Sequence, residues 1–235
     1  LVHERALAAL FEAVVAARGC SLGYPTILTQ HGEILHNFHQ TDLLTEGALL
    51  LVDGGGEVGA GYGVDITRTW PVSGQFTARQ RGAYEAVLQA QVDAIARCRV
   101  GVRYREVHDI ASLGIARFLA DEGIVRCDPQ SAVEAGAHAL FFPHGVGHLL
   151  GMDVHDLENF GDLSSYPPGQ ARPEQFGTCY LRLDLPLEAG WVVTVEPGFY
   201  VVPAILADAK LRDRFRGMVD FDAAEKWLGF GGIRI

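Results

Sequence analysis

The sequence predicts an α+β protein built around a mostly antiparallel sheet. The expected elements follow one another in the order helix, strands, two helices and strands, which favours this class. The segment Val64–Trp70 alternates, with Asp65, Thr67 and Thr69 on one face. A period of two residues is typical of a half-buried strand.

Helix caps and β-forming runs place the individual elements. The first helix ends at Gly19, and Thr77 with Gln80 forms a capping box that opens the second helix. The expected helices cover residues 2–18, 77–98 and 105–122. The expected strands lie near residues 25–29, 48–52, 64–70, 191–196 and 232–235. A segment rich in proline and glycine, residues 164–178, is interpreted as an excursion or a lid.

Composition and charge exclude several classes of protein. The 235 residues are 49% hydrophobic and 20% charged, as in a globular protein with one sizeable core or two small domains. A net charge of −10 without a basic block argues against nucleic-acid binding. No apolar run approaches the roughly 20 residues of a membrane helix, and the amphipathic start is not a signal peptide. The four scattered cysteines are interpreted as reduced thiols of a cytoplasmic protein.

The stretch LLLVDGGGEVGAGYGVDITRTW contains half of a dinucleotide-binding fingerprint. Gly54, Gly56 and Gly59 spell G-x-G-x-x-G after a strand-like run. In a dinucleotide fold a helix begins at these glycines, so that its N-terminus faces the pyrophosphate. Here a β-like segment follows the glycines, and the next helix begins only after Thr77. The sequence therefore disfavours a nucleotide-binding oxidoreductase.

A hairpin explains this stretch better. Gly59 is the midpoint between Asp53 and Asp65, so strands that fold back at Gly59 bring the two acids face to face. Two ionised carboxylates at that separation repel unless a cation or a shared proton lies between them. The alternative is an aspartate that caps a turn beside an unrelated surface aspartate, and this stretch alone does not decide between the two.

Histidines and a late glutamate form two further groups of candidates. His144, His148 and His155 fall within twelve positions among glycines, which favours a site over isolated core histidines. In WVVTVEPGFY an apolar strand ends at Glu196, immediately before Pro197. A carboxylate at the end of a buried strand is costly unless it is paired or bound to a metal.

Five motifs, LVDGG, DITRTWPVSG, FPHGVGHLLGMDVHD, VTVEPGFY and GIRI, run in this order along nearly the whole chain. Together they resemble the metal-dependent aminopeptidase and prolidase family. The resemblance implies the pita-bread fold, in which two pseudo-twofold α+β halves surround a curved antiparallel sheet. It also implies that residues 1–235 are a metallopeptidase catalytic domain, incomplete at both ends.

The resemblance implies a ligand set for two divalent ions. Asp53, Asp65, His148 and Glu196 match four of the family's five ligands. The fifth, a glutamate, is expected immediately after Ile235. Ligation by carboxylates with a single histidine suits Mn²⁺, with Co²⁺ or Zn²⁺ as alternatives.

The motifs are closer to the Xaa-Pro branch of the family than to the methionine aminopeptidases. The resemblance assigns His36 and His155, together with Glu196, to catalysis. It assigns a pocket for the proline ring to His144, Tyr200 and Arg234. The spacing of the two aspartates is one residue longer than usual in this branch, and residues 202–230 are expected to form a helical insertion.

The resemblance implies hydrolysis of Xaa-Pro bonds in peptides or dipeptides by a metal-bridging hydroxide. It further implies a homodimer, with no nucleic-acid or membrane partner. The rival functions are a methionine aminopeptidase and a metal-free relative, either a creatinase-like enzyme or a non-catalytic binding module on the same fold.

Overall fold

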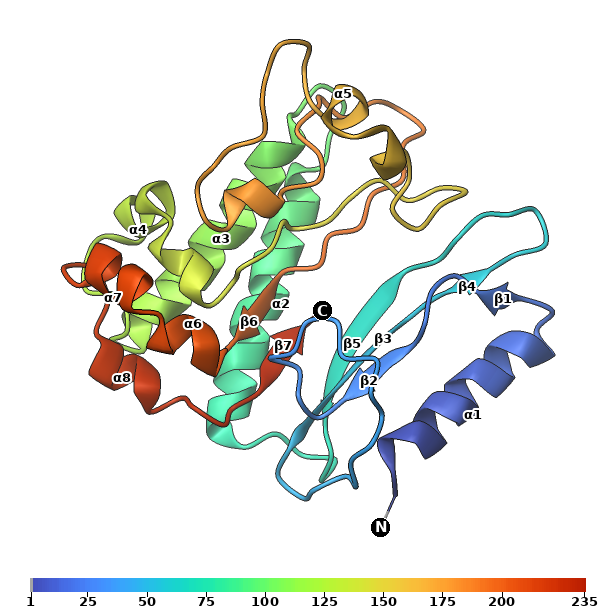
Figure 1. Ribbon diagram of the computed structural model, residues 1–235, viewed down its shortest axis with the longest axis horizontal. Coiled ribbons are helices and arrows are strands. Elements are labelled where there is room, and N and C mark those ends of the chain that lie inside the picture. Colours follow the sequence, from blue (N-terminus) through green and yellow to red (C-terminus); the bar gives the residue numbers. More distant parts are fainter. Residues whose placement is uncertain (1) are drawn as a thin grey trace.

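The computed structural model describes residues 2–235 as an α+β arrangement of short antiparallel sheets and helices (Figure 1). The helices are α1 (Glu4–Ala17), α2 (Ala78–Arg97), α3 (Tyr104–Asp121), α4 (Pro129–Ala135), α5 (Asp162–Ser165), α6 (Pro203–Ala207), α7 (Ala209–Phe215) and α8 (Phe221–Glu225). The strands are β1 (Ser21–Leu22), β2 (Ile27–Thr29), β3 (Leu49–Gly54), β4 (Gly56–Glu57), β5 (Ile66–Pro71), β6 (Gly198–Tyr200) and β7 (Gly232–Arg234). Within the described residues no helix is long and apolar enough to span a bilayer.

The first half of the chain forms a three-stranded antiparallel sheet in the order β2-β3-β5. Helix α1 lies beside this sheet (Figure 1) and buries Ala8 against Leu28 and Leu50. Outward residues of β5 alternate with buried Thr67 and Thr69, which confirms the predicted half-buried strand. The sheet thus holds the ends of β3 and β5, and with them both aspartates, in a fixed register.

The hairpin that joins β3 to β5 has a different centre from the predicted one. Asp53 pairs with Thr67, not with Asp65, so the prediction that the two aspartates lie directly opposite is wrong. The turn closes between Val58 and Tyr62, which centres it on Ala60 instead of Gly59. This register shifts Asp65 by two positions, and a shift of two leaves it on the same face of the hairpin as Asp53.

The second half is built on the long helices α2 and α3, which pack side by side (Figure 1). The capping box of Thr77 and Gln80 is present at the start of α2, as predicted. The main apolar core lies between these helices and strands β6 and β7, where Phe118, Phe199 and Trp227 meet edge to face. The predicted helical character of residues 202–230 is also confirmed, because α6, α7 and α8 fall within this range.

The predicted strand over residues 191–196 is wrong as a regular element. This segment is extended, but among the described residues its only β-bridge joins Val193 to Leu149. Backbone hydrogen bonds nevertheless tie Thr194 to His148 and Glu196 to Val146. At Gly147 the chains approach so closely that a Cβ would lie 2.3 Å from the Thr194 carbonyl oxygen. The segment therefore carries Glu196 directly alongside the histidine-rich segment.

Two core histidines are expected to make the fold sensitive to acid. Burial lowers the pKa of His108 to about 3 and of His138 to about 4. Both stay neutral in the folded protein, whereas the unfolded chain binds a proton on each below about pH 6.5. Stability therefore falls as the pH drops, by ~2–3 kcal/mol for each histidine between pH 7 and 4.5.

Urea unfolding at several pH values measures this effect. In His108→Leu the free energy of unfolding is expected to depend less steeply on pH in the acid range, by the slope that corresponds to about one proton. The exposed His39→Gln is the matched control. An acid limb of unchanged slope in His108→Leu would contradict the assignment.

Candidate metal centre

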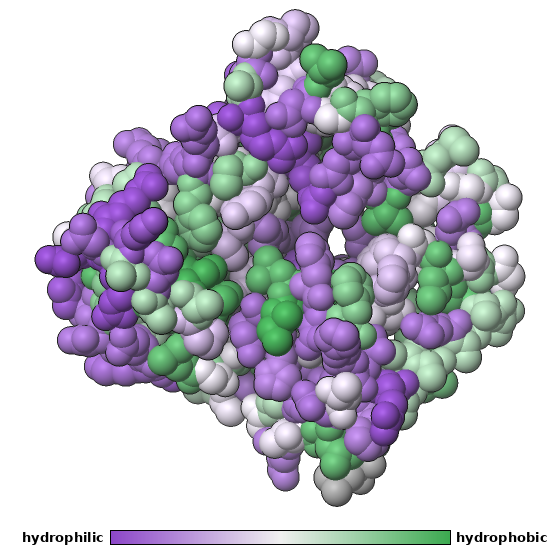
Figure 2. Space-filling model, in the orientation of Figure 1, coloured by the Kyte–Doolittle hydropathy of each residue, from purple (hydrophilic) through white to green (hydrophobic). Residues whose placement is uncertain are grey.

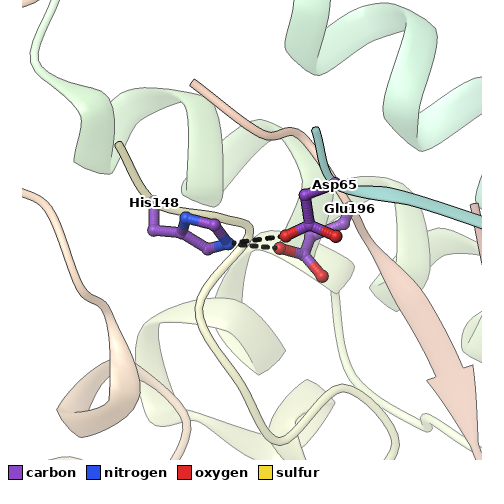
Figure 3. Close-up of side chains that lie close together, drawn as sticks. All are labelled: Asp65, His148 and Glu196. Carbon is purple, nitrogen blue, oxygen red and sulfur yellow. Dashed lines mark hydrogen bonds and ion pairs between the residues drawn. The ribbon is translucent and has the colours of Figure 1, made fainter. Parts of the chain in front are cut away.

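Three predicted ligands meet where the two halves of the chain face one another (Figure 3). Asp65 directly precedes β5, His148 follows the segment 141–147, and Glu196 lies two residues before β6. His148 Nε2 is 3.2 Å from Asp65 Oδ2 and 3.3 Å from Glu196 Oε1. One ligand atom from each residue lies within 4.8 Å of the other two. This geometry is that of a cluster able to hold a cation.

The tautomer of His148 suits metal binding. Its Nδ1 lies 2.8 Å from the carbonyl oxygen of Leu149, which only accepts, so Nδ1 carries the proton. Nε2 is then the atom that faces the two carboxylates. A backbone carbonyl that fixes a histidine in this way is typical of metal-binding histidines.

The charges of the cluster are strongly coupled to one another. Burial disfavours the charged form of His148, but hydrogen bonds to Asp65 and Glu196 outweigh it and raise its pKa to about 10. Burial likewise acts against ionised Glu196, but His148 and Arg234 lower the pKa of Glu196 to about 2. The protonated imidazole thus supplies positive charge between two carboxylates, as a divalent ion would.

The fourth predicted ligand, Asp53, lies beside the cluster and has other partners. Its Oδ2 accepts a hydrogen bond from Arg234 Nη2, and its Oδ1 lies 2.5 Å from the Tyr24 hydroxyl. The same hydroxyl is 2.6 Å from Asp65 Oδ1, so the two aspartates share one contact. Burial raises the pKa of Asp53, even though Arg234 acts in the opposite direction.

The residues present fit a divalent metal. Two carboxylates and the imidazole nitrogen of His148 converge, and a third carboxylate, on Asp53, shares the Tyr24 hydroxyl with Asp65. A hydroxyl has a single proton, so Tyr24 cannot satisfy both aspartates at once. Closely spaced carboxylates need a proton or a cation, and oxygen-rich donors suit hard to borderline ions. Asp65, His148 and Glu196 would therefore hold the metal, with Asp53 adjacent.

The cluster forms part of the lining of a pocket of about 910 Å³. The space-filling view shows a hollow near the centre of the molecule, bordered largely by hydrophilic side chains (Figure 2). Four further predicted residues line this pocket: His36, His144, His155 and Arg234. His36 stacks on Phe38 at a centroid separation of 6.4 Å, and burial lowers its pKa.

Tyr200 is placed differently from the other predicted pocket residues. It is fully buried and stands behind His144, with its hydroxyl 2.9 Å from His144 Nε2. His144 Nδ1 donates to the carbonyl oxygen of Gly145, so Nε2 accepts the proton of the Tyr200 hydroxyl. Burial lowers the pKa of His144 to about 4, so that its ring is neutral. Tyr200 thus orients the ring of His144 and is not itself a wall of the pocket.

His155 lies against the ligand histidine. Its ring is 4.4 Å from the ring of His148 and nearly perpendicular to it. Its Nδ1 lies 3.0 Å from Glu158 Oε2 and 3.4 Å from Arg182 Nη1. Burial and the charges of His148 and Arg182 lower its pKa, which leaves a neutral ring beside the cluster.

Tyr24 is the functional candidate that the sequence analysis did not identify. It lies in a segment after β1 that carries no metal-ligand pattern. Tyr24 precedes Asp53 by 29 residues, and only the folding of the chain brings its hydroxyl to the aspartates. A tyrosine beside Gly23 gives no sequence signal for such a contact.

Removing the Tyr24 hydroxyl is expected to weaken metal binding. In Tyr24→Phe the two aspartates lose the hydroxyl that they share, and loss of such an orienting contact typically lowers metal affinity about 10–100-fold. Calorimetric titration with Mn²⁺ measures the change. The exposed Tyr62→Phe is the control, and equal affinities of the two variants would contradict the role of Tyr24.

Comparison with known proteins identifies the family. A model described as metallopeptidase family M24 matches residues 1–235. The chain belongs to this family. A probable Xaa-Pro aminopeptidase of Fusarium vanettenii is 36% identical over 239 residues, covering 99% of this chain and 48% of that protein.

Solved M24 structures share the fold. The aminopeptidase PepP of Pseudomonas aeruginosa matches with a TM-score of 0.77 and 30% identity, covering 100% of this chain and 46% of its own. An Escherichia coli aminopeptidase P variant in complex with substrate matches with a TM-score of 0.77 and 31% identity, again over 100% of this chain and 46% of the other. The predicted pita-bread fold is thus confirmed. The chain spans about half the length of the curated relatives it matches.

Proposed function

We propose that this chain is the catalytic domain of a metal-dependent peptidase that hydrolyses the bond between an N-terminal residue and proline. The observation that carries the proposal is the cluster of Asp65, His148 and Glu196 in the lining of a pocket that also includes neutral His144. A relative of similar sequence is named a probable Xaa-Pro aminopeptidase, and a solved structure of similar fold is an aminopeptidase P, which supports this choice of substrate.

Two divalent ions, with Mn²⁺ as the first choice, would be held by Asp53, Asp65, His148 and Glu196. Bound ions of this kind lower the pKa of water and polarise a carbonyl group, which would provide hydroxide near neutral pH. Glu196 is anionic over the whole working range, because its pKa is lowered to about 2. As an ionised carboxylate in the cluster, it would accept the proton of the attacking water and pass it to the leaving nitrogen.

His155 and His36 are the proposed donors to the developing negative charge. The nearer partner of His155 Nδ1 is the Glu158 carboxylate, which only accepts, so Nδ1 carries the proton of the neutral ring and Nε2 would donate once it has taken up a second proton. A preorganised donor of this kind stabilises charge that grows on the carbonyl oxygen in the transition state. His36 has no hydrogen-bond partner for its ring among the contacts of residues 2–235, which leaves its ring available to substrate.

Proline recognition is assigned to the wall formed by His144. The Arg234 guanidinium, the Tyr200 hydroxyl and His144 form a chain of hydrogen bonds that fixes the orientation of this ring. A neutral, fixed imidazole offers a flat surface for a pyrrolidine ring. Arg234 also neutralises Asp53, so its charge is engaged before substrate arrives.

Cleavage of Ala-Pro and Ala-Ala peptides by the full-length, Mn²⁺-loaded protein tests the proposal. The kcat/KM is expected to be higher for Ala-Pro by roughly 10–200-fold, the range that a shaped pocket provides. Equal rates, or faster cleavage after an N-terminal methionine, would favour the methionine aminopeptidase rival. A protein that binds no metal and cleaves none of these peptides would favour the metal-free alternatives.

A further inference from the structure

Two aromatic side chains, here called the aromatic edge, line the pocket in addition to the metal cluster and the proposed proline wall. Phe176 and Tyr180 both line the pocket, and their ring centroids are 6.3 Å apart at an angle of 84°. Tyr180 is 51% exposed, so part of its ring is accessible at the pocket that it lines. Neither ring belongs to the metal cluster, to the groups proposed to move the proton or donate to the substrate, or to the proposed proline wall.

The chain that carries these two rings is anchored to the site. A Cβ at Gly145, the residue after His144, would lie 2.9 Å from the carbonyl oxygen of Tyr180. Two residues after Tyr180, the guanidinium of Arg182 reaches His155, whose ring contacts His148. Residues 180–182 therefore run from the proposed proline wall toward the residues beside the proposed metal ligands, and Phe176 packs against the start of this stretch through Tyr180.

The pocket that contains the aromatic edge also has polar lining residues, among them Asp153, Glu158, Asn159 and Arg182. Arg182 and Glu158 form an ion pair, so their charges are compensated by one another. Phe176 and Tyr180 thus add aromatic surface to a pocket of mixed polarity.

We propose that the edge formed by Phe176 and Tyr180 binds the side chain of the residue that follows proline, and that it selects large apolar or aromatic residues there. The inference rests on the proposed function. An aminopeptidase has a single residue on the amino side of the scissile bond, so only the chain after proline extends away from the carboxylate cluster. From a proline ring at His144, that chain passes the segment which begins at Phe176.

The size of the effect follows from the contact. Aromatic pairs contribute modestly beyond the area that they bury, so one aromatic contact is expected to change kcat/KM about three- to tenfold. A small polar residue at the same position of the substrate would gain nothing from the edge. The expected signature is a ratio between two peptides that differ only after proline.

The test compares Ala-Pro-Phe, Ala-Pro-Ser and the dipeptide Ala-Pro on the full-length, Mn²⁺-loaded protein. The kcat/KM for Ala-Pro-Phe is expected to exceed that for Ala-Pro-Ser about three- to tenfold, and this ratio falls to about one in the double variant Phe176→Ala, Tyr180→Ala. The ratio does not depend on the fraction of active protein, since both peptides meet the same enzyme. Tyr62→Ala, which removes an exposed ring outside the pocket, is the matched control and keeps the ratio.

The outcomes separate this inference from the proposed function. A wild-type ratio near one, or a ratio that survives the double variant, overturns the aromatic subsite. Cleavage of Ala-Pro without cleavage of either tripeptide also overturns it and leaves the proposed function intact. If none of the three peptides is cleaved, both the aromatic subsite and the proposed function are overturned.

Discussion

Replacing His148 by alanine is expected to empty the metal site, whereas replacing His155 leaves the metal bound and slows turnover. Both rings lie in the same pocket, 4.4 Å apart, but only the Nε2 of His148 faces Asp65 and Glu196. Loss of a partner that only orients a ligand costs about 10–100-fold in metal affinity, so loss of the ligand itself is expected to cost at least about 100-fold.

His155 has a different consequence because its contacts lead away from the cluster. Its Nδ1 is engaged by Glu158 and Arg182, which leaves Nε2 as the ring nitrogen that can exchange a proton or a hydrogen bond with the substrate. Loss of a positioned group of this kind typically lowers kcat about 10²–10⁴-fold.

Metal content after dialysis, titration with Mn²⁺ and kcat on Ala-Pro distinguish the two variants. His39→Ala, at an exposed histidine, is the control for the loss of an imidazole as such. Equal loss of metal in His148→Ala and His155→Ala would show that the two roles are wrongly assigned.

The sequence predicted the residues of the site better than it predicted their partners. Asp65, His148 and Glu196 stand at the ends of strand-like or glycine-rich segments, and the structure brings them together. Asp53 was placed with them, but its carboxylate is engaged by Arg234 and Tyr24. These contacts join residues 181 and 29 positions apart, and spacing along the chain carries no signal for them.

Local patterns also set the limits of the fold prediction. The alternation in β5 and the capping box of α2 depend on neighbouring residues, and both are confirmed. The centre of the hairpin depends on which two residues form the hydrogen bond that closes the turn. The equal spacing of Asp53 and Asp65 about Gly59 could not reveal that Val58 bonds to Tyr62. Likewise, WVVTVE has the composition of a strand, but its ladder to the glycine-rich segment is interrupted at Thr194. There the His148 amide donates to the Thr194 hydroxyl, and the Thr194 carbonyl accepts from the Tyr104 hydroxyl.

Glu196→Gln is expected to lower kcat on Ala-Pro about 10²–10⁴-fold, and this loss persists at saturating metal. Glutamine keeps the shape of the side chain and can still accept the hydrogen bond of Thr194, 3.0 Å away. It removes the negative charge that faces His148 and Arg234, and with it the group proposed to move the proton.

Asp65→Asn is the comparison that separates ligation from proton transfer. Both substitutions remove one carboxylate from the cluster, so both weaken metal binding, which titration with Mn²⁺ records. Asp65 has no proposed role in moving the proton, so excess Mn²⁺ is expected to restore kcat further in Asp65→Asn than in Glu196→Gln. Equal recovery in the two variants would mean that Glu196 is a ligand without a role as a base, and that the proton must leave the water by another of the pocket's groups.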